Sequence, residues 1–462
     1  MIGTIAIQKI REEKEKFIDL AQKMWENPET AYNEVKACAW TAELMKEYGF
    51  EVEVGAYGLP TCVVARYGSG HPVVGLLGEL DALPGLSQKI QPTKEAIVPN
   101  GAGHGCGHNL MNAACAAAAV GMKAEMEAKN LPGTIVFYGC PAEEVLTGKV
   151  FMARHGAFKD LDCVFAWHGS MGNTVGLGGG NGLNSAIFHF KGRTAHAGGD
   201  PHNGRSALDA AELMSVGTQY LREHVTSDIS IHYSYKEAGT APNIVPDKAS
   251  VWYYVRGASR QTIEETYDRL VKVAEGAAMM TETEMEIEFL GGCYNGMSNE
   301  YMSRLGYELM GQLEKPVFTQ EELDFADALN KNNPNYERAL ASGKLANGPI
   351  STTLAPIMKT VGGGGSTDVA DVQHIVPCGK LFTVISNAAA SSHNWQFTAC
   401  SGHSLGHKGM LFGAELLAAA SLKMIEEPEH LVAAKAEFDR EMHGIAYKCP
   451  IPMDVPIPQP QK

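Results

Sequence analysis

The sequence predicts an α/β fold in which a mixed, largely parallel sheet is flanked by helices and carries an inserted β-α-β-β-α-β (ferredoxin-like) domain. Short apolar runs alternate with amphipathic segments early in the chain, as parallel strands alternate with crossover helices. A second, differently ordered series of strands and helices occupies the middle. Clusters of polar residues follow several of the apolar runs.

The larger domain begins with residues 5–47, where apolar positions recur at helical spacing and predict one amphipathic helix. Further strands are expected within 51–80 and at 134–140, 163–169 and 380–386. Helices are expected at 109–129, 147–155 and 301–313, and a polar loop at 81–107. The glycine runs at 176–182 and 362–365 lack nucleotide-binding spacing and predict tight turns. The Pro-rich tail, 449–462, predicts a surface segment.

The inserted domain is predicted because the order of the expected strands and helices changes near residue 184. Strands are expected at 184–197, 230–239, 247–258 and 284–293, with helices at 206–225 and 260–281. This is the order of a split β-α-β sandwich. We therefore expect a discontinuous larger domain of residues 1–183 and 295–462, interrupted by an insertion of residues 184–294.

Composition excludes several classes of protein. The 462 residues carry a net charge of −15 without a basic cluster, so a nucleic-acid partner is not expected. Charges interrupt the N-terminal segment too early for a secretory signal, and no apolar run is long enough to span a membrane. The ten cysteines are scattered, which is typical of a reducing compartment. We therefore expect a cytoplasmic protein.

The chemically informative residues fall where predicted strands end. Glu79 and Asp81 end one strand, the pair Glu143-Glu144 follows another, His168 closes a third and His393 comes shortly after a fourth. Functional groups of open α/β sheets gather beyond the carboxyl ends of the strands, so these residues could share one crevice. Considered alone, His168 would more commonly be a histidine buried in the core, and Glu143-Glu144 would more commonly be a solvated acidic pair.

The densest motif is His104-Gly-Cys106-Gly-His108-Asn109. Interleaved glycines allow tight backbone turns, and thiolate, imidazole and carboxylate are ligands of borderline-soft divalent ions. A metal site is favoured over an incidental Gly-rich turn. With two adjacent carboxylates available, one can bind a metal while its neighbour moves protons during hydrolysis.

A competing motif is Gly402-His403-Ser404-Leu405-Gly406, which matches the nucleophile elbow of serine hydrolases. The elbow requires a buried strand directly before the serine, and the preceding SSHNWQFTACS is a poor strand. We interpret the match as coincidence, and a serine hydrolase using Ser404 remains the alternative enzyme class.

With these residues assembled, the chain resembles the co-catalytic metallopeptidase/amidohydrolase family of aminoacylases, carboxypeptidase G, hippurate hydrolase and auxin-conjugate hydrolases. Within it the chain is similar to the subgroup of p-aminobenzoyl-glutamate hydrolase subunits. The likeness is carried by GELDALPG, GHGCGHN, FYGCPAEE, FKGRTAHA, SALDA, AEGAAMMTET, GSTDV and HKGM, which cover most of the chain. The combination of GHxCGH with a later EE pair is highly specific for this family.

The resemblance implies two divalent metal ions per subunit, Zn or Mn, and a role for each matching residue. The implied metal ligands are Cys106, which bridges both ions, and His108, Glu144, His168 and His393. Glu143 matches the general base. Asp81 matches an Asp that orients a ligand without binding the metal. His393 matches the C-terminal histidine ligand better than His403 or His407 does.

The insertion resembles the family's lid and dimerisation domain. His196 matches a histidine that reaches the active site of the partner subunit to stabilise the oxyanion. Asn243 and Arg256 match residues that hold the substrate's carboxylate or carbonyl. Without the resemblance, these three residues would be interpreted as a loop histidine, a turn residue and an exposed strand charge. A homodimer through the lid is expected, and a heteromer is an alternative.

Two departures from the family pattern concern the pocket. Asn109 stands where many members have Asp, as in the aminobenzoyl-glutamate subgroup, and VLTGK replaces a Gly-rich run after Glu144. The implied function is metal-dependent hydrolysis of an amide bond in N-acyl or N-aroyl amino acids or dipeptides, similar to p-aminobenzoyl-glutamate. A catalytically silent metal-binding partner subunit is the non-enzymatic alternative.

Overall fold

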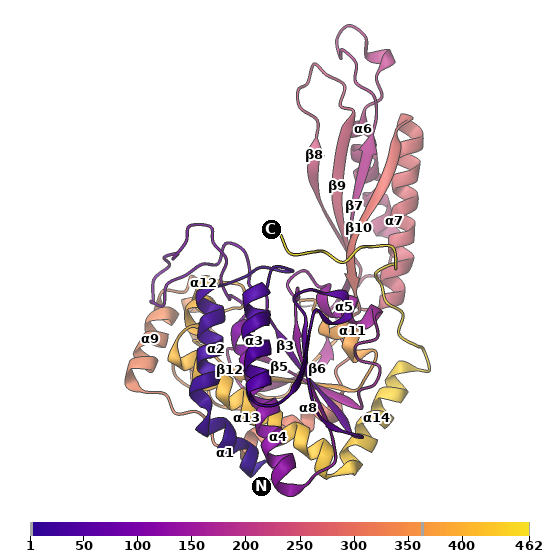
Figure 1. Cartoon of the computed structure of the whole chain (residues 1–462). Helices are drawn as coiled ribbons and strands as arrows, with labels where there is room; N and C mark the ends of the chain where they lie inside the picture. Colours follow the sequence, from indigo (N-terminus) through magenta and orange to yellow (C-terminus); the bar gives the residue numbers. More distant parts are fainter. Residues whose placement is uncertain (1–2, 362–364, 462) are drawn as a thin grey trace.

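Two lobes make up the protein in a computed structural model that describes residues 3–361 and 365–461 (Figure 1). The larger lobe contains an eight-stranded sheet of order β1-β2-β4-β3-β5-β12-β6-β11, and the smaller lobe projects from it with a four-stranded sheet of order β10-β7-β9-β8. The α/β fold predicted from the sequence is confirmed.

The large sheet is parallel at its centre. Strands β4, β3, β5 and β12 are adjacent and parallel, whereas β1, β2 and β6 join in antiparallel pairs and β11 pairs parallel with β6. Its strands are β1 (Glu51–Val54), β2 (Val63–Ser69), β3 (Val73–Glu79), β4 (Gly133–Cys140), β5 (Cys163–Ser170), β6 (Thr174–Gly179), β11 (Lys359–Val361) and β12 (Cys378–Val384).

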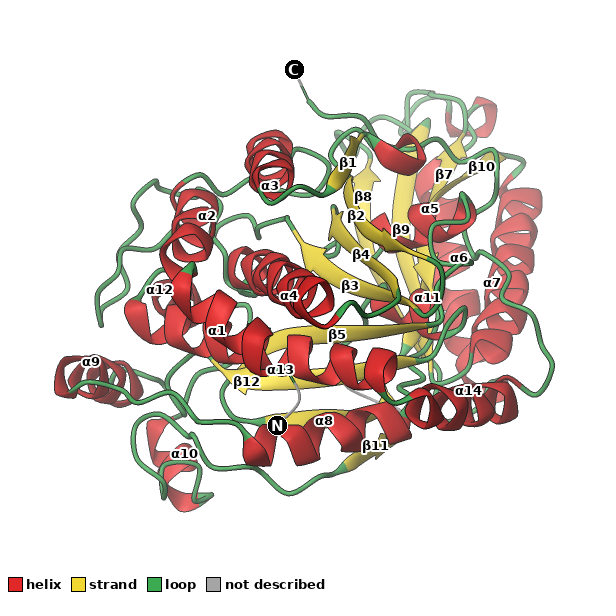
Figure 2. Cartoon of the chain, turned by 60° about the horizontal axis from the view of Figure 1, so that its bottom comes forward, coloured by secondary structure: helices red, strands yellow, loops and turns green. Residues whose placement is uncertain are grey.

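Helices cover both faces of this sheet, which explains the nearly continuous apolar strands. In β5, Phe165 and Trp167 pack into one core, whereas Val164 and Ala166 pack into the other. The first core is covered by α1 (Thr4–Glu12), α2 (Lys14–Glu26), α3 (Val35–Glu47), α4 (His108–Lys129), α8 (Glu300–Gln312) and α13 (Ser404–Glu426). The second is covered by α5 (Gly148–Arg154) and α11 (Val369–Gln373). Figure 2 shows α1, α4 and α13 on the near side of the sheet.

The remaining helices of the larger lobe lie at its edges. They are α9 (Gln320–Lys331), α10 (Tyr336–Ala341), α12 (Trp395–Ser401) and α14 (Pro428–Met442). Among the residues that the structure describes, no helix combines the length and apolar character that crossing a bilayer requires.

The smaller lobe is an antiparallel sheet with two helices on one face. It contains β7 (Gly182–Lys191), α6 (Ala207–Leu221), β8 (Ser230–Ala238), β9 (Lys248–Gly257), α7 (Arg260–Thr281) and β10 (Glu284–Cys293). In β9, Val251, Tyr253 and Val255 are buried against the helices. Trp252, Tyr254 and Arg256 alternate with them and therefore lie on the opposite face.

Two sequence-based predictions are wrong. Residues 5–47 form three helices instead of one, because Glu13 leaves the helical backbone and because Pro28 disfavours helix at Asn27. The glycine run at 176–182 is not only a turn. Its first part belongs to β6, where the buried side chains of Val175 and Leu177 lie on either side of Gly176 in the sequence. In the second glycine run, residues 362–364 lie outside the described residues.

The C-terminal segment crosses the surface between the two lobes (Figure 1). Arg154 donates hydrogen bonds to the carbonyl oxygens of Pro452 and Val455, and Ile451 is buried in the second core. Near the chain end, the backbone N–H of Gln461 donates to the side-chain oxygen of Asn33. The tail is thus a surface segment, as predicted, and it is anchored along its length.

Candidate metal centre

Four adjacent parallel strands deliver polar groups to one edge of the large sheet. Glu79 ends β3, the Glu143-Glu144 pair follows β4, His168 lies near the end of β5 and His393 follows β12. Because β4, β3, β5 and β12 are parallel neighbours, their carboxyl ends meet at the same edge. The convergence predicted from the sequence is present.

His108 occupies the centre of this cluster. Gly107, whose φ is +83°, caps α4 and places His108 in its first turn, where the side chain is fully buried. The imidazole Nδ1 lies 2.9 Å from the carbonyl oxygen of Asp81 and 3.2 Å from Oδ1 of the same residue. This contact fixes the ring, and Nε2 faces Oε2 of Glu79 at 3.1 Å and Oε2 of Glu143 at 3.8 Å.

Cys106 links the remaining candidate ligands. Its Sγ lies 3.3 Å from Nε2 of His168. On the other side, His393 Nε2 lies 3.4 Å from Oε2 of Glu144. Potential ligand atoms lie within 4.8 Å of one another in three sets, which are Cys106, His108 and His168; Cys106, Glu144 and His393; and Glu79, His108 and Glu143. All five ligands predicted from the sequence therefore lie in one cluster.

The backbone around the cluster adopts conformations that are rare for residues with a side chain. Ala142, Leu146 and His393 have φ angles of 58°, 60° and 60°. Hydrogen bonds hold the first and last of these conformations, because the N–H of Ala142 donates to Glu34 and the N–H of His393 donates to the carbonyl of Gly105. Such strain typically persists at functional sites, where the surrounding structure enforces it.

Burial shifts the protonation equilibria of the cluster. It raises the pKa of Glu143 to about 8, and the Glu79 carboxylate adds to that shift. Burial also raises the pKa of Glu144 to about 7. It lowers the pKa of His168 to about 4 and also lowers the pKa of His393. Both histidines are consequently neutral near pH 7, the form that binds metal ions.

The donor set fits divalent cations. Oε2 of Glu79, Nε2 of His108 and Oε1 of Glu144 are buried and have no hydrogen-bond partner among the described residues. Buried polar atoms that lack a partner are costly, and a cation among them would remove that cost. The thiol, imidazole and carboxylate groups are the ligand types of Zn²⁺, and the carboxylates also suit Mn²⁺.

A cavity of about 870 Å³ opens above the cluster. Cys106, Glu143, Glu144 and His393 lie in its floor, whereas Trp252, Tyr254 and Arg256 reach it from β9 of the smaller lobe. Nε of Arg256 is buried with no hydrogen-bond partner among the described residues. The cavity thus combines a polar floor with aromatic walls and one cationic group.

Two of the predicted site residues lie elsewhere in the chain's own fold. His196 and Asn243 are exposed, and neither lines the cavity. They belong to neighbouring backbone segments of the smaller lobe, because the N–H of Ala197 donates to the carbonyl of Asn243. Nδ1 of His196 accepts hydrogen bonds from the N–H groups of Gly198 and Gly199. Within one chain these two side chains do not join the cluster.

The Ser404 motif does not form a nucleophile elbow. The segment before it is helix α12, and Ser404 is the first residue of α13. Its hydroxyl donates to Glu322 at 2.7 Å, and the neighbouring His403 stacks on Phe325 with ring centroids 4.1 Å apart. Residues 385–403, directly before this serine, contain no strand, and His403 is engaged as the cap of α13. The geometry gives no support to a serine hydrolase.

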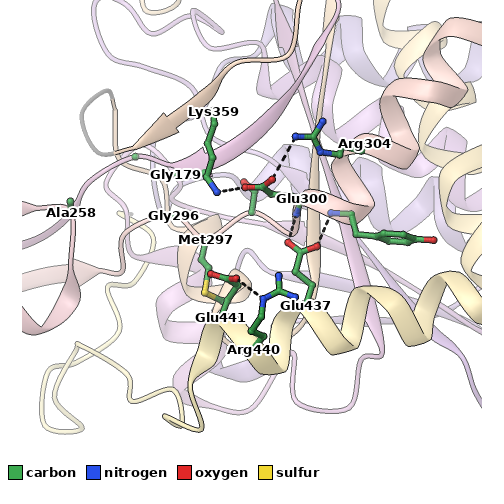
Figure 3. A pocket seen from close by; sticks show the side chains of 14 residues that line it. Gly179, Ala258, Gly296, Met297, Glu300, Arg304, Lys359, Glu437, Arg440 and Glu441 are labelled. Atoms are coloured by element: carbon green, nitrogen blue, oxygen red, sulfur yellow. Dashed lines mark hydrogen bonds and ion pairs between the residues drawn. The ribbon is translucent and has the colours of Figure 1, made fainter.

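A second cavity, of about 570 Å³, lies beside α8 and α14 (Figure 3). Its charged side chains pair with one another, as Glu300 does with Lys359 and Arg304, and Arg440 with Glu441. Glu437 accepts hydrogen bonds from the N–H groups at the start of α8. The cavity contains none of the candidate ligands, so the reaction centre is not located there.

Three buried residues next to the cluster, Glu79, Lys149 and Asp368, receive no role from the sequence or from the resemblance. Lys149 is fully buried and contacts both Glu79 and Asp368. The sequence places Glu79 at a polar strand end together with Asp81, but it gives Glu79 no role in the site. Lys149 and Asp368 carry no motif of their own that indicates a shared contact.

A parallel-centred sheet with helices on both faces, and with thiol, imidazole and carboxylate groups gathered at its carboxyl edge, defines a hydrolase with a metal centre. The chain belongs to peptidase family M20/M25/M40, whose model matches residues 75–315. Members of this family hydrolyse amide bonds with the help of divalent metal ions, and the chain is therefore a metal-dependent amidohydrolase or peptidase.

Similar proteins are known from bacteria and animals. The chain is 35% identical to one of the p-aminobenzoyl-glutamate hydrolase subunits of Escherichia coli K12, with 98% of each chain covered. It is 27% identical to the Xaa-Arg dipeptidase of Mus musculus, with 94% of this chain and 91% of the relative covered. An aminobenzoyl-glutamate utilization protein of Klebsiella pneumoniae has the same fold, with a TM-score of 0.63, 18% identity and coverage of 91% of this chain and 98% of that chain.

Proposed function

We propose that this protein hydrolyses the amide bond of N-acyl or N-aroyl amino acids or dipeptides of the p-aminobenzoyl-glutamate class. The observation that carries the proposal is the position of Glu143, which lies in the cavity floor beside the candidate ligands and 3.8 Å from His108. The similarity to a p-aminobenzoyl-glutamate hydrolase over nearly the whole chain supports the substrate class.

Cys106, His108, Glu144, His168 and His393 would hold two divalent ions, Zn²⁺ or Mn²⁺. Cys106 is common to the two sets that contain the other four proposed ligands, which supports its role as a shared ligand. Such ions act as Lewis acids and lower the pKa of a nearby water. Asp81 fixes the ring of His108 through Nδ1 and so leaves Nε2 to face the centre.

Glu143 is the proposed general base. Its carboxylate accepts a proton from the attacking water, and the same carboxyl then donates that proton to the leaving nitrogen as the C–N bond breaks. Burial and the neighbouring Glu79 raise the pKa of Glu143 towards neutrality, which suits a group that both accepts and returns a proton.

The cavity walls suit an aromatic acyl group next to a carboxylate. Trp252 and Tyr254 provide an apolar surface, and the unpaired Nε of Arg256 lies beside them. The guanidinium lies 5.4 Å from the centroid of the Tyr254 ring. Arg256 would bind the carboxylate of the released amino acid by charge-assisted hydrogen bonds.

A homodimer through the smaller lobe would complete the site. Exposed apolar side chains lie on α6 and β8, including Val216, Tyr220 and Tyr233, as expected of a surface that contacts a second chain. His196 and Asn243, which do not reach the cavity of their own chain, would then act in the partner's cavity. Because two different p-aminobenzoyl-glutamate hydrolase subunits of Escherichia coli are among the relatives, a heteromer is the alternative assembly.

All ten cysteines are free, and nine of them are buried. A protein without disulfides, and with a thiol as a metal ligand, suits a reducing compartment. This supports a cytoplasmic location as part of the proposal.

Replacement of Glu143 by Gln tests the function. Purified Glu143→Gln protein loaded with Zn²⁺ or Mn²⁺ should retain its metal content while kcat for p-aminobenzoyl-glutamate falls by about 10² or more. Hippurate, auxin conjugates and dipeptides, assayed beside it, would define the substrate. Glu321→Gln is the matched control and should be unaffected, because Glu321 is an exposed glutamate in another acidic pair, on α9.

Near-normal turnover by the Glu143→Gln protein would refute Glu143 as the base. Inactivity of the metal-loaded wild-type chain towards every substrate would favour a silent partner chain. Activity that withstands chelators but is blocked by an organophosphonate would instead favour Ser404.

A further inference from the structure

A buried ionic triad lies directly beneath the candidate metal centre. Nζ of Lys149 lies 2.6 Å from Oε1 of Glu79 and 2.7 Å from Oδ1 of Asp368. The backbone N–H of Lys149 also donates to Oδ2 of Asp368 at 2.8 Å. All three side chains are buried, with Lys149 and Asp368 fully inaccessible. The triad therefore places one ammonium group between two carboxyl groups that are almost completely shielded from solvent.

Stability alone does not account for this arrangement. Removing three charges from water costs several kcal/mol per ion, and a neutral triad of similar volume is often as stable or more stable. A group that the triad places next to the reaction centre would explain why the charges are present.

That group is the second oxygen of Glu79. Lys149 binds Oε1, and Oε2 therefore points to the other side, where it lies 3.1 Å from Nε2 of His108. These two buried atoms contact each other as an ion pair, and neither forms a hydrogen bond with any of the described residues. Glu79, His108 and Glu143 form one of the three sets of potential ligand atoms.

The triad also joins the segments that carry the site. Glu79 ends β3, Lys149 lies in the first turn of α5 just after the Glu143-Glu144 pair, and Asp368 directly precedes α11. Gly148 permits this close approach, because a Cβ at that position would lie only 1.7 Å from the carbonyl oxygen of Pro141. A displacement of Lys149 would consequently move the turn that holds Glu143.

We infer that Lys149 and Asp368 are positioning residues that fix the Glu79 carboxylate as an additional anionic group of the metal centre, facing His108 and the general base Glu143. This inference rests on the proposed function for the role of Glu143. Glu79 adds negative charge where divalent cations would bind, and the orientation of its carboxylate depends on Lys149.

The test compares a charge-removing variant with one that neutralises the whole triad. Glu79→Gln retains the size of the side chain and an oxygen for Lys149. Its affinity for Zn²⁺, measured by competition with a chelating dye, should fall by about 10- to 100-fold, the usual effect of losing a group that supports metal ligands. kcat should fall as well, whereas KM should change little.

The triple variant Glu79→Gln, Lys149→Met, Asp368→Asn separates positioning from folding. Its melting temperature should lie near that of the wild type, because no buried charge is left unpaired. Its Zn²⁺ affinity and kcat should nevertheless remain as low as those of Glu79→Gln. Recovery of metal affinity and kcat together with stability would show that the triad is only structural and would overturn the inference.

The pair Lys408–Glu322, at 2.6 Å and remote from the cavity, provides the control. Lys408→Met with Glu322→Gln should leave Zn²⁺ affinity unchanged. Because metal affinity is measured without substrate, a loss of affinity in Glu79→Gln supports the inference even if no tested amide is hydrolysed. Wild-type affinity in Glu79→Gln overturns it even if Glu143 proves to be the base.

Discussion

Nε2 of His393 lies 3.4 Å from Oε2 of Glu144, and the two residues come from loops that follow different strands of the large sheet. Glu144 is nearly inaccessible, but 54% of the His393 side chain is exposed. The contact therefore joins the buried floor of the cavity to its mouth. His393 is the most accessible of the five proposed ligands, and its backbone has a φ angle of 60°.

Replacement of His393 by Ala should remove one of the two proposed ions. We expect the Zn²⁺ content, measured by mass spectrometry after dialysis, to fall from about two ions per chain to about one, because the second ion would lose an imidazole ligand. His403→Ala should retain the wild-type content, since His403 stacks on Phe325 away from the cluster. Equal losses in both variants would contradict this assignment.

Metal affinity should rise with pH. Burial raises the pKa of Cys106 to about 12. Burial alone would lower the pKa of His108, but Cys106 and Glu79 outweigh it and raise that pKa well above its usual value. Metal binding must displace protons from both groups, so lowering the pH opposes binding. Calorimetric titrations with Zn²⁺ in buffers of different ionisation enthalpy should detect proton release, and binding without it would contradict the prediction.

Arg256→Met should impair substrate binding. Loss of a charge-assisted hydrogen bond of about 1.5–3 kcal/mol predicts a KM that is about 10- to 100-fold higher, with kcat nearly unchanged. Lys236→Met is a suitable control, because Lys236 is an exposed cation whose Nζ lies 5.4 Å from the centroid of the Trp252 ring and which does not line the cavity. For a substrate whose carboxylate is blocked as an ester or amide, wild type and Arg256→Met should have similar KM values.

Two inactive variants should complement each other if His196 acts in the partner's cavity. A mixed dimer of Glu143→Gln and His196→Ala contains one cavity in which both residues are intact. Random re-association should thus restore about a quarter of wild-type activity, because half of the dimers are mixed and one of their two sites is complete. Activity that stays at the level of the separate variants after the chains have exchanged would place His196 outside the partner's cavity.

The sequence predicts that the candidate ligands lie close together, because they follow strands that are easily recognised. Each apolar strand fixes which edge its following loop reaches, so Glu144, His168 and His393 can be placed without coordinates. Lys149 could not be placed, because its partners Glu79 and Asp368 are far apart in sequence and meet only through α5 and α11. A lysine in a helical segment is ordinarily exposed.

The ends of helices are likewise difficult to predict from the sequence. The apolar spacing of residues 5–47 continues through both breaks, because each short helix packs its apolar face against the same core. Periodicity therefore reports burial and not continuity of the backbone. The glycine run 176–182 is the converse case, since neighbouring strands supply the hydrogen bonds that make residues 174–179 a strand in spite of their composition.

The course of the C-terminal segment affects how the protein can be fused or immobilised. Pro458 lines the cavity, and Gln461 is held by Asn33 next to Tyr32 of the cavity wall. A purification tag joined at this end would emerge at the substrate entrance and obstruct it. Gly3 lies against α13 on the far side of the larger lobe, so attachment to a surface or reporter through that end leaves the entrance clear (Figure 1).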